Sequence, residues 1–140
     1  VHLTGKKDYF YKDLGKFKTH PNLVVRDFSN EIPALLQNAD LAISRAGAGA
    51  ISELMVTKTP SILIPFPLSA DQHQELNAAY MARFGGAIIV NQNHSKGSIL
   101  KDIISNLLSS NSLIRMKSNM NNYDLVNPEK KIFEILSSII

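Results

Sequence analysis

Short apolar runs alternate with longer segments of mixed polarity along most of the chain. The longer segments place apolar residues three and four positions apart, as amphipathic helices do. The apolar runs predict β-strands at His2–Thr4, Leu23–Arg26, Leu41–Ser44, Ser61–Ile64 and Ala87–Val90. The other segments predict helices at Glu31–Asn38, Ala50–Met55, Gln72–Phe84 and Ser98–Ser109, and a last helix that opens at Pro128. Strands that alternate with helices pair in parallel, so the pattern predicts an α/β fold with a Rossmann-like parallel sheet flanked by helices.

A glycine-containing turn follows the predicted strand that ends at Ser44. Gly47 and Gly49 allow the backbone to turn tightly and to approach a ligand. Because the start of a helix carries unpaired N–H groups and the positive end of the dipole, the turn predicts a phosphate site above Gly49 and Ala50. The Glu53 carboxylate, about one turn further on, suits the two hydroxyls of a ribose. Taken alone, the turn is better explained as an ordinary strand-to-helix junction, by roughly two to one.

A second polar cluster follows the next predicted strand. Asp71 is placed to cap a helix, and Gln74 and Asn77 share one face of that helix with His73 beside them. Loops at the carboxyl ends of neighbouring parallel strands converge on one crevice. The two clusters therefore predict one ligand site, in which these side chains bind sugar hydroxyls. A capped helix with a solvated face is the alternative interpretation.

Length and composition indicate one soluble domain. The chain has 140 residues, of which 44% are hydrophobic, enough for a single core. It has no cysteine, which excludes disulfides and cysteine-ligated zinc. The apolar runs are shorter than the roughly 18 residues that a membrane span needs. The histidines are too far apart in sequence for a known ligand motif, and no serine lies in a Gly-x-Ser-x-Gly turn, so we predict neither a metal site nor a hydrolase.

The basic character of the chain raises the question of nucleic-acid binding. The net charge is +3, the isoelectric point is near 9.2, and lysines gather between Lys6 and Lys18. No known nucleic-acid module accompanies them. An exposed lysine-rich helix is the favoured interpretation, and such a face would also suit an anionic membrane surface. We therefore predict no nucleic-acid partner.

Three segments together resemble a known enzyme family. Ser44–Glu53, Pro60–Pro65 and Asp71–Ala78 are closely similar, in residue type and spacing, to the carboxyl-terminal domain of the MurG family. These are bacterial transferases of glycosyltransferase family 28 in the GT-B superfamily, and the resemblance covers nearly the whole chain. It implies the donor half of a hexosyltransferase of peptidoglycan synthesis, without a cofactor. The family moves N-acetylglucosamine from UDP-N-acetylglucosamine onto undecaprenyl-diphosphate-linked N-acetylmuramoyl-pentapeptide, which converts lipid I to lipid II.

The resemblance also implies a donor site. Amides of the glycine turn lie near the diphosphate, Glu53 binds the ribose, the backbone at Ser29 reads the uracil, and His73 or Gln74 contacts the sugar. Ala50 offers no hydroxyl to the phosphate, so amide contacts must suffice. The expected substrate-binding residues are Phe28, Ser29, Arg45, Gly47, Ala48, Gly49, Ala50, Ile51, Ser52, Glu53, His73, Gln74 and Asn77. No catalytic residue is expected in this chain.

In that family an amino-terminal domain carries the acceptor site and the general base, and a Gly-Gly-Ser-x-Gly turn opens the carboxyl-terminal domain. Neither is found in these 140 residues. We therefore expect a fragment, a single UDP-sugar-binding domain over residues 1–140 that begins near the second strand of the donor half and is inactive alone. The whole enzyme would be cytoplasmic and peripheral at the inner face of the plasma membrane. The alternatives are a donor-binding subunit of a split transferase and a catalytically inactive remnant that binds nucleotide sugars.

Overall fold

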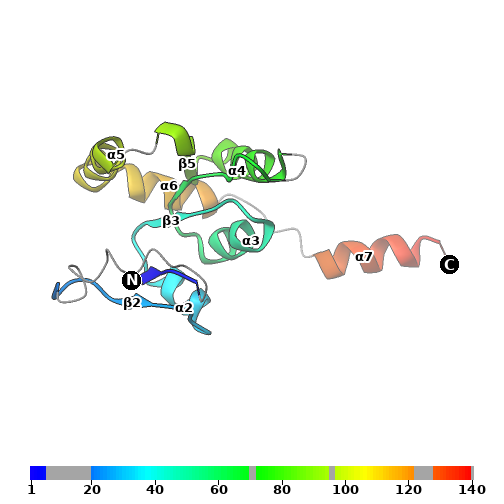
Figure 1. Cartoon of the computed structure of the whole chain (residues 1–140). Coiled ribbons are helices and arrows are strands. Elements are labelled where there is room, and N and C mark those ends of the chain that lie inside the picture. The colour runs from blue at the N-terminus through cyan, green and yellow to red at the C-terminus, as the bar shows by residue number, and fades with distance from the viewer. Residues whose placement is uncertain (6–19, 70–71, 95–96, 122–127, 140) are drawn as a thin grey trace. The chain divides into compact units, whose positions relative to one another are not determined.

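The computed structural model describes residues 1–5, 20–69, 72–94, 97–121 and 128–139 (Figure 1). Strands and helices alternate through most of these ranges, which confirms the predicted fold class. The elements are β1 (His2–Leu3), β2 (Val25–Arg26), α2 (Ile32–Gln37), β3 (Ala42–Ser44), α3 (Ala48–Thr57), β4 (Ser61–Leu63), α4 (His73–Arg83), β5 (Ala87–Ile89), η2 (Gln92–His94), α5 (Gly97–Ser109), α6 (Ser112–Asn121) and α7 (Pro128–Ser137).

The chain forms two compact units, residues 1–35 and 36–140. In the first unit, β1 and β2 pair in parallel, with His2 opposite Val25. The Glu31 N–H donates to the Ser29 hydroxyl over 3.0 Å, just before α2 begins. Such a hydroxyl satisfies a backbone donor that the first turn of a helix leaves unpaired.

The second unit is built on a parallel sheet with the strand order β3-β4-β5. The central strand β4 is fully buried, as expected for a parallel strand covered on both faces. The Ile64 N–H still donates to the Ser44 carbonyl over 2.9 Å, and the ladder stops at Pro65, which has no N–H. Parallel pairing is confirmed, and the described strands form a two-stranded and a three-stranded group.

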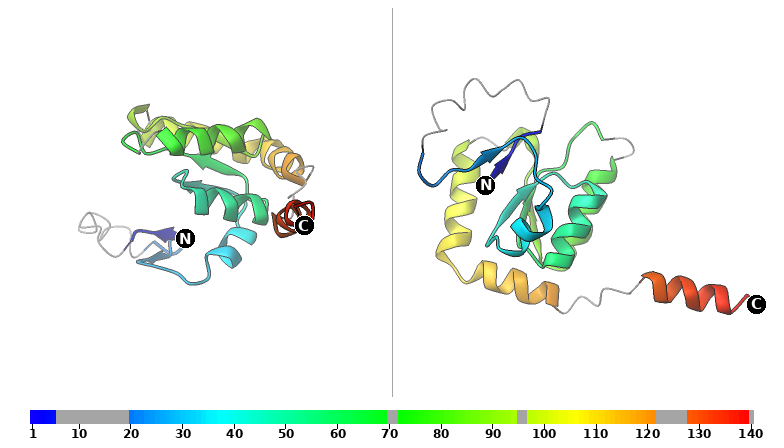
Figure 2. Two further views of the ribbon diagram at one scale, coloured as in Figure 1. Left: turned by 90° about the vertical axis from the view of Figure 1, so that its right-hand side faces the viewer. Right: turned by 90° about the horizontal axis from the view of Figure 1, so that it is seen from below.

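Helices cover both faces of the three-stranded sheet (Figure 2). Neighbouring residues of a strand point to opposite faces, and the two core clusters follow this alternation. Leu63 packs with α3 and α4 through Leu54 and Met81, while Ile62 packs with Leu107 of α5. The sheet and its helices therefore position the carboxyl ends of β3 and β4.

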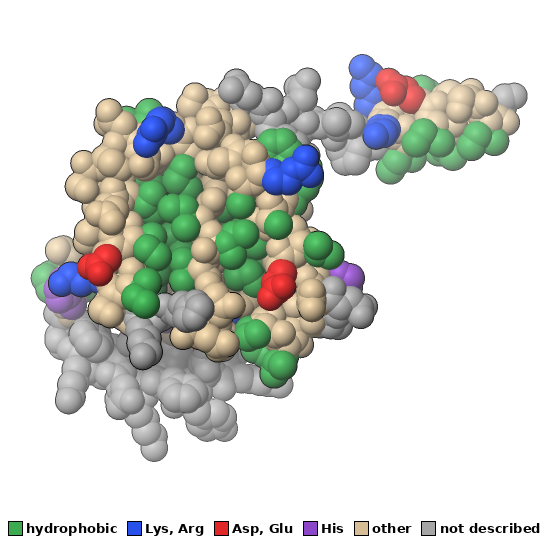
Figure 3. Space-filling view, turned by 90° about the horizontal axis from the view of Figure 1, so that it is seen from above, with side chains coloured by type: hydrophobic (Ala, Val, Ile, Leu, Met, Phe, Trp, Pro, Cys, Tyr) green, Lys and Arg blue, Asp and Glu red, His purple; other side chains and the backbone are tan. Residues whose placement is uncertain are grey.

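The last helix, α7, is amphipathic. Its large apolar side chains Ile132, Phe133 and Leu136 are exposed, and Figure 3 shows hydrophobic side chains gathered along one side of this helix. Lys130 and Glu134 form an exposed ion pair at 4.0 Å. Among the residues that the structure describes, no helix has both the length and the apolar character needed to cross a bilayer.

Candidate functional site

The junction of β3 and α3 presents the amino end of a ten-residue helix. Gly47 is the cap residue, with φ −65° and ψ 150°, and contributes no side-chain cap. The Ile51 N–H donates to the Gly47 carbonyl over 3.0 Å, so the helical ladder starts there. The N–H groups of Ala48, Gly49 and Ala50 precede that bond and have no partner within the helix. They point along the axis toward any anion placed beyond the helix end.

The structure corrects the expected role of the glycines. The helix begins at Ala48 rather than at Ala50, so Gly49 lies within its first turn. Neither glycine has a positive φ, a conformation that the described glycines adopt only at Gly5 and Gly85. A Cβ added at Gly47 or Gly49 would meet no atom within 4 Å. The glycines therefore leave the backbone uncovered, which permits the close approach of a ligand, although the turn itself would accept other residues.

Glu53 lies further along α3 and is half-buried. Its backbone carbonyl accepts from the Thr57 hydroxyl over 2.8 Å. Its carboxylate makes no hydrogen bond or ion pair with any residue in the described part of the chain. A rise of about 1.5 Å per residue places Glu53 about 6 Å beyond Gly49. The helix end and this residue are thus about one helical turn apart along α3.

Arg45 joins the loop after β3 to the loop after β4. Its Nη1 donates to the carbonyls of Ile64, at 3.1 Å, and Pro65, at 3.4 Å. The guanidinium carbon also lies 5.6 Å from the centre of the Phe66 ring, within the range of a cation–π contact. The two loops therefore lie close together, as expected. Arg45, which was predicted to bind the ligand, uses one of its nitrogens for the contact between the loops.

Two amide side chains of α4 reach the same loops. Gln74 accepts the Phe66 N–H through Oε1 at 2.9 Å, which leaves its –NH₂ group as the donor for a ligand. Asn77 donates through Nδ2 to the Ala46 carbonyl at 3.0 Å. Both side chains were expected to bind a sugar, and in the structure both form hydrogen bonds with the loop backbone.

The remaining predicted residues differ in setting. His73 is the exposed first residue of α4. The cap position before it is Gln72, with a left-handed φ of 55°, and the expected cap Asp71 lies outside the described residues. Phe28 and Ser29 belong to the first unit. Phe28 is exposed and Ser29 is buried.

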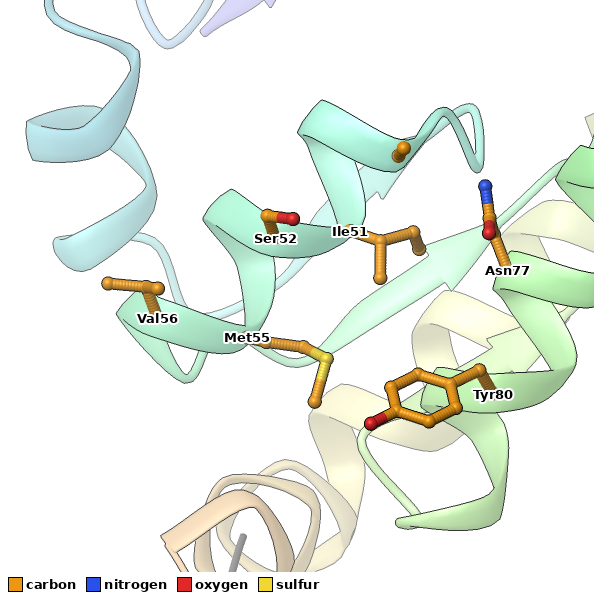
Figure 4. Close-up of a pocket in the computed structure, with 7 residues that line it drawn as sticks. Ile51, Ser52, Met55, Val56, Asn77 and Tyr80 are labelled. Carbon is orange, nitrogen blue, oxygen red and sulfur yellow. The ribbon is translucent and has the colours of Figure 1, made fainter. Parts of the chain in front are cut away.

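A pocket of about 310 Å³ lies between α3 and α4 (Figure 4). Four of the predicted residues line it, namely Ala48, Ile51, Ser52 and Asn77. Sequence reasoning missed its other members, Met55, Val56 and Tyr80. The helical spacing of Met55 and Val56 from Ile51 and Ser52 was the signal for two of them.

A second pocket of about 210 Å³ lies at the carboxyl ends of β4 and β5. Pro65, Glu75 and Asn91 are among its residues. Asn91 follows directly on a predicted strand, and the parallel topology places such residues at the ligand edge of the sheet. No group of three or more histidine, aspartate or glutamate side chains suited to a metal ion occurs within the described ranges.

Comparison with known proteins identifies the family of this chain. Residues 1–133 match the family described as glycosyltransferase family 28 C-terminal domain. Over 139 residues the chain is 76% identical to a Prochlorococcus marinus (strain NATL2A) protein named UDP-N-acetylglucosamine--N-acetylmuramyl-(pentapeptide) pyrophosphoryl-undecaprenol N-acetylglucosamine transferase, covering 99% of this chain and 40% of the relative. A protein of the same name from Parasynechococcus marenigrum (strain WH8102) is 44% identical over 149 residues, covering 100% of this chain and 40% of that relative. The chain thus spans about 40% of the length of these curated relatives.

The fold has a close structural neighbour. The crystal structure of Acinetobacter baumannii MurG matches 98% of this chain and 42% of its own, with a TM-score of 0.82 at 22% sequence identity. The structural match supports the fold, and the family match extends from Val1 to beyond the start of α7. The chain belongs to glycosyltransferase family 28, in the part that forms the family's carboxyl-terminal domain.

Proposed function

We propose that this chain is the donor-binding domain of an inverting hexosyltransferase that uses UDP-N-acetylglucosamine. The observation that carries the proposal is the uncovered amino end of α3 at Gly47 and Gly49. One turn further on lies the Glu53 carboxylate, which has no hydrogen-bond or ion-pair partner among the described residues. The names of relatives up to 76% identical specify the same donor.

The donor diphosphate lies at the helix end, where the amides of Ala48, Gly49 and Ala50 compensate its charge. The Glu53 carboxylate accepts hydrogen bonds from the ribose diol. The –NH₂ group of Gln74, whose oxygen is held by the Phe66 N–H, donates to a hydroxyl of the sugar. The remaining expected contacts are uracil at the Ser29 backbone beside Phe28, and further polar contacts from Arg45, Ser52, His73 and Asn77.

In the proposed reaction a hydroxyl of the acceptor attacks the anomeric carbon while the bond to UDP breaks. The helix end stabilises the negative charge that develops on the departing diphosphate, and the mechanism requires no metal. The general base and the lipid-linked N-acetylmuramoyl-pentapeptide acceptor belong to the part of the enzyme outside these residues. The whole enzyme acts in peptidoglycan synthesis, as a cytoplasmic protein peripheral to the membrane that holds its acceptor.

An NMR titration of the ¹⁵N-labelled 140-residue chain with UDP-N-acetylglucosamine tests donor binding. We expect saturable amide shifts at Gly47, Gly49 and Gln74 that weaken in Glu53→Ala. The matched control is Glu134→Ala, because that carboxylate forms an exposed ion pair within α7 and its loss should leave binding unchanged. A folded chain whose amides do not shift would overturn donor binding by this domain alone.

A further inference from the structure

The peptide that joins Ala46 to Gly47 is held by a side chain from another element. Ala46 is completely buried, and its carbonyl accepts the Asn77 Nδ2–H from α4 at 3.0 Å. In Figure 4 the Asn77 nitrogen points to the loop that precedes α3. This contact ties the backbone of the turn to a helix that packs on the same core.

Holding this carbonyl also sets the direction of an amide. A trans peptide is planar, so the Ala46 C=O and the Gly47 N–H point in opposite directions. When Asn77 fixes the carbonyl, the Gly47 N–H must point the other way. That amide is adjacent to the N–H groups of the first turn of α3.

Gly47 makes this peptide easy to rotate. Turning the peptide plane over changes ψ of Ala46 and φ of Gly47, and glycine adopts positive φ about as readily as negative φ. The observed φ of −65° is open to any residue, and a Cβ at Gly47 would meet no atom within 4 Å. Local sterics at residue 47 therefore do little to select between the two orientations, whereas the hydrogen bond from Asn77 favours one of them.

We propose that Asn77 is a positioning residue that locks the Ala46–Gly47 peptide, so that the amides at the start of α3 present one arrangement to an anionic ligand. This role is distinct from the direct sugar contact expected from the sequence. It rests on the proposed function only for the identity of the ligand, a nucleoside diphosphate sugar. The lock itself is a property of the ligand-free chain.

The first test needs no ligand. In Asn77→Leu, which keeps the volume and loses the donor, the Gly47 and Ala48 amide signals should broaden as the peptide exchanges between orientations. Asn77→Asp has nearly the same shape and loses the donor when ionised, so the same two signals should broaden. This variant provides the test if Asn77→Leu fails to fold. Adding Gly47→Ala should sharpen the signals, because alanine disfavours positive φ. Asn106→Leu, on the exposed face of α5, is the matched control and should change nothing at the turn.

Sharp and unshifted Gly47 and Ala48 signals in folded Asn77→Leu or Asn77→Asp would overturn the proposal. So would broadening that Gly47→Ala leaves unchanged. Either result is independent of whether the chain binds the donor. A failure of the proposed function and a failure of the lock can therefore be told apart.

The second test is a double-mutant cycle on UDP binding by the same chain. One net hydrogen bond corresponds to as much as about tenfold in affinity, so Asn77→Leu should raise the Kd for UDP by about that factor. In the Gly47→Ala background the same substitution should raise the Kd for UDP by about twofold or less, since alanine at residue 47 already disfavours the rotated peptide. Equal costs in both backgrounds would show that Asn77 acts independently of the peptide, which overturns the positioning role. Absence of UDP binding by the unmutated chain would count against the proposed function, and the ligand-free test would then decide on Asn77.

Discussion

Arg45 Nη1 donates to the Ile64 carbonyl over 3.1 Å and thereby ties the loops that follow two neighbouring strands. The same nitrogen lies 3.4 Å from the Pro65 carbonyl. One guanidinium nitrogen thus lies within hydrogen-bond distance of two consecutive carbonyls after β4, while the guanidinium carbon lies over the Phe66 ring, 5.6 Å from its centre. Arg45 thus links the two loops that were expected to form the ligand site.

The first prediction concerns this link. Arg45→Lys retains the charge but lacks the planar group that can reach both carbonyls and lie against Phe66. We expect a loss of about 0.5–1.5 kcal/mol in the free energy of unfolding, the usual net contribution of a hydrogen bond. Urea unfolding measures it. Arg83→Lys, an exposed arginine in the last turn of α4, is the control, and an equal effect of both variants would show that the loop contacts add nothing.

The second prediction separates the ribose contact from general electrostatics. In Glu53→Gln the carboxylate becomes a neutral amide, and hydrogen bonds to a charged group contribute roughly 1.5–3 kcal/mol. The Kd for UDP should rise about tenfold or more. With 2′-deoxy-UDP, which lacks one hydroxyl, the same substitution should cost clearly less. Calorimetric titration of both nucleotides provides the comparison, and an equal loss for the two would place Glu53 away from the diol.

The third prediction concerns a buried polar link at the end of α3. Thr59 is 1% exposed, and its hydroxyl donates to the Leu36 carbonyl over 2.8 Å and lies 2.7 Å from the Thr57 hydroxyl. Thr59→Val keeps the shape but leaves these groups without that partner. The free energy of unfolding should fall by about 1–3 kcal/mol, the usual cost of leaving a buried polar group without its partner.

Thermal unfolding of Thr59→Val beside Thr59→Ser checks this expectation, since the serine variant keeps the hydroxyl and loses only a methyl group. The serine variant should retain more stability than the valine variant. The reverse order would mean that packing of the methyl group outweighs the hydrogen bonds at this position.

The fold class could be predicted from the periodicity of hydrophobic residues in the sequence. The apolar run Ser61–Ile64, bounded by Pro60 and Pro65, could be assigned as a buried strand because a parallel strand covered on both faces is apolar throughout. The start of α3 was placed two residues late, because glycine is a poor helix former whereas Gly49 is tolerated in the first turn.

Most side-chain contacts within the candidate site could not be predicted from the sequence. The bonds from Arg45 to Ile64 and from Asn77 to Ala46 join residues 19 and 31 positions apart. The first depends on the pairing of β3 with β4 and the second on the packing of α4 against α3 and the sheet, and local pattern does not specify the side-chain partners in either case. Sequence reasoning predicted polar residues at a ligand site, which stays a prediction, and the structure shows that Arg45, Gln74 and Asn77 form hydrogen bonds with the backbone of the neighbouring loops.

The last prediction sets stability against binding at one position. Gly49 lies in the first turn of α3, and an added Cβ would meet no atom within 4 Å. Gly49→Ala should therefore stabilise the chain, by at most about 1 kcal/mol, because alanine loses less backbone entropy in a helix. Under the proposed function the new methyl group occupies the space through which the diphosphate approaches the amides. UDP affinity should then fall although the chain becomes more stable.

Gly97→Ala is the matched control, because Gly97 also opens a helix and has equally open surroundings. Its substitution should leave UDP affinity unchanged. Unfolding curves and UDP titrations of the two variants decide the matter together. If Gly49→Ala binds UDP as well as the unmutated chain does, the uncovered backbone at this turn is not where the diphosphate lies, and the glycines serve only the junction of strand and helix.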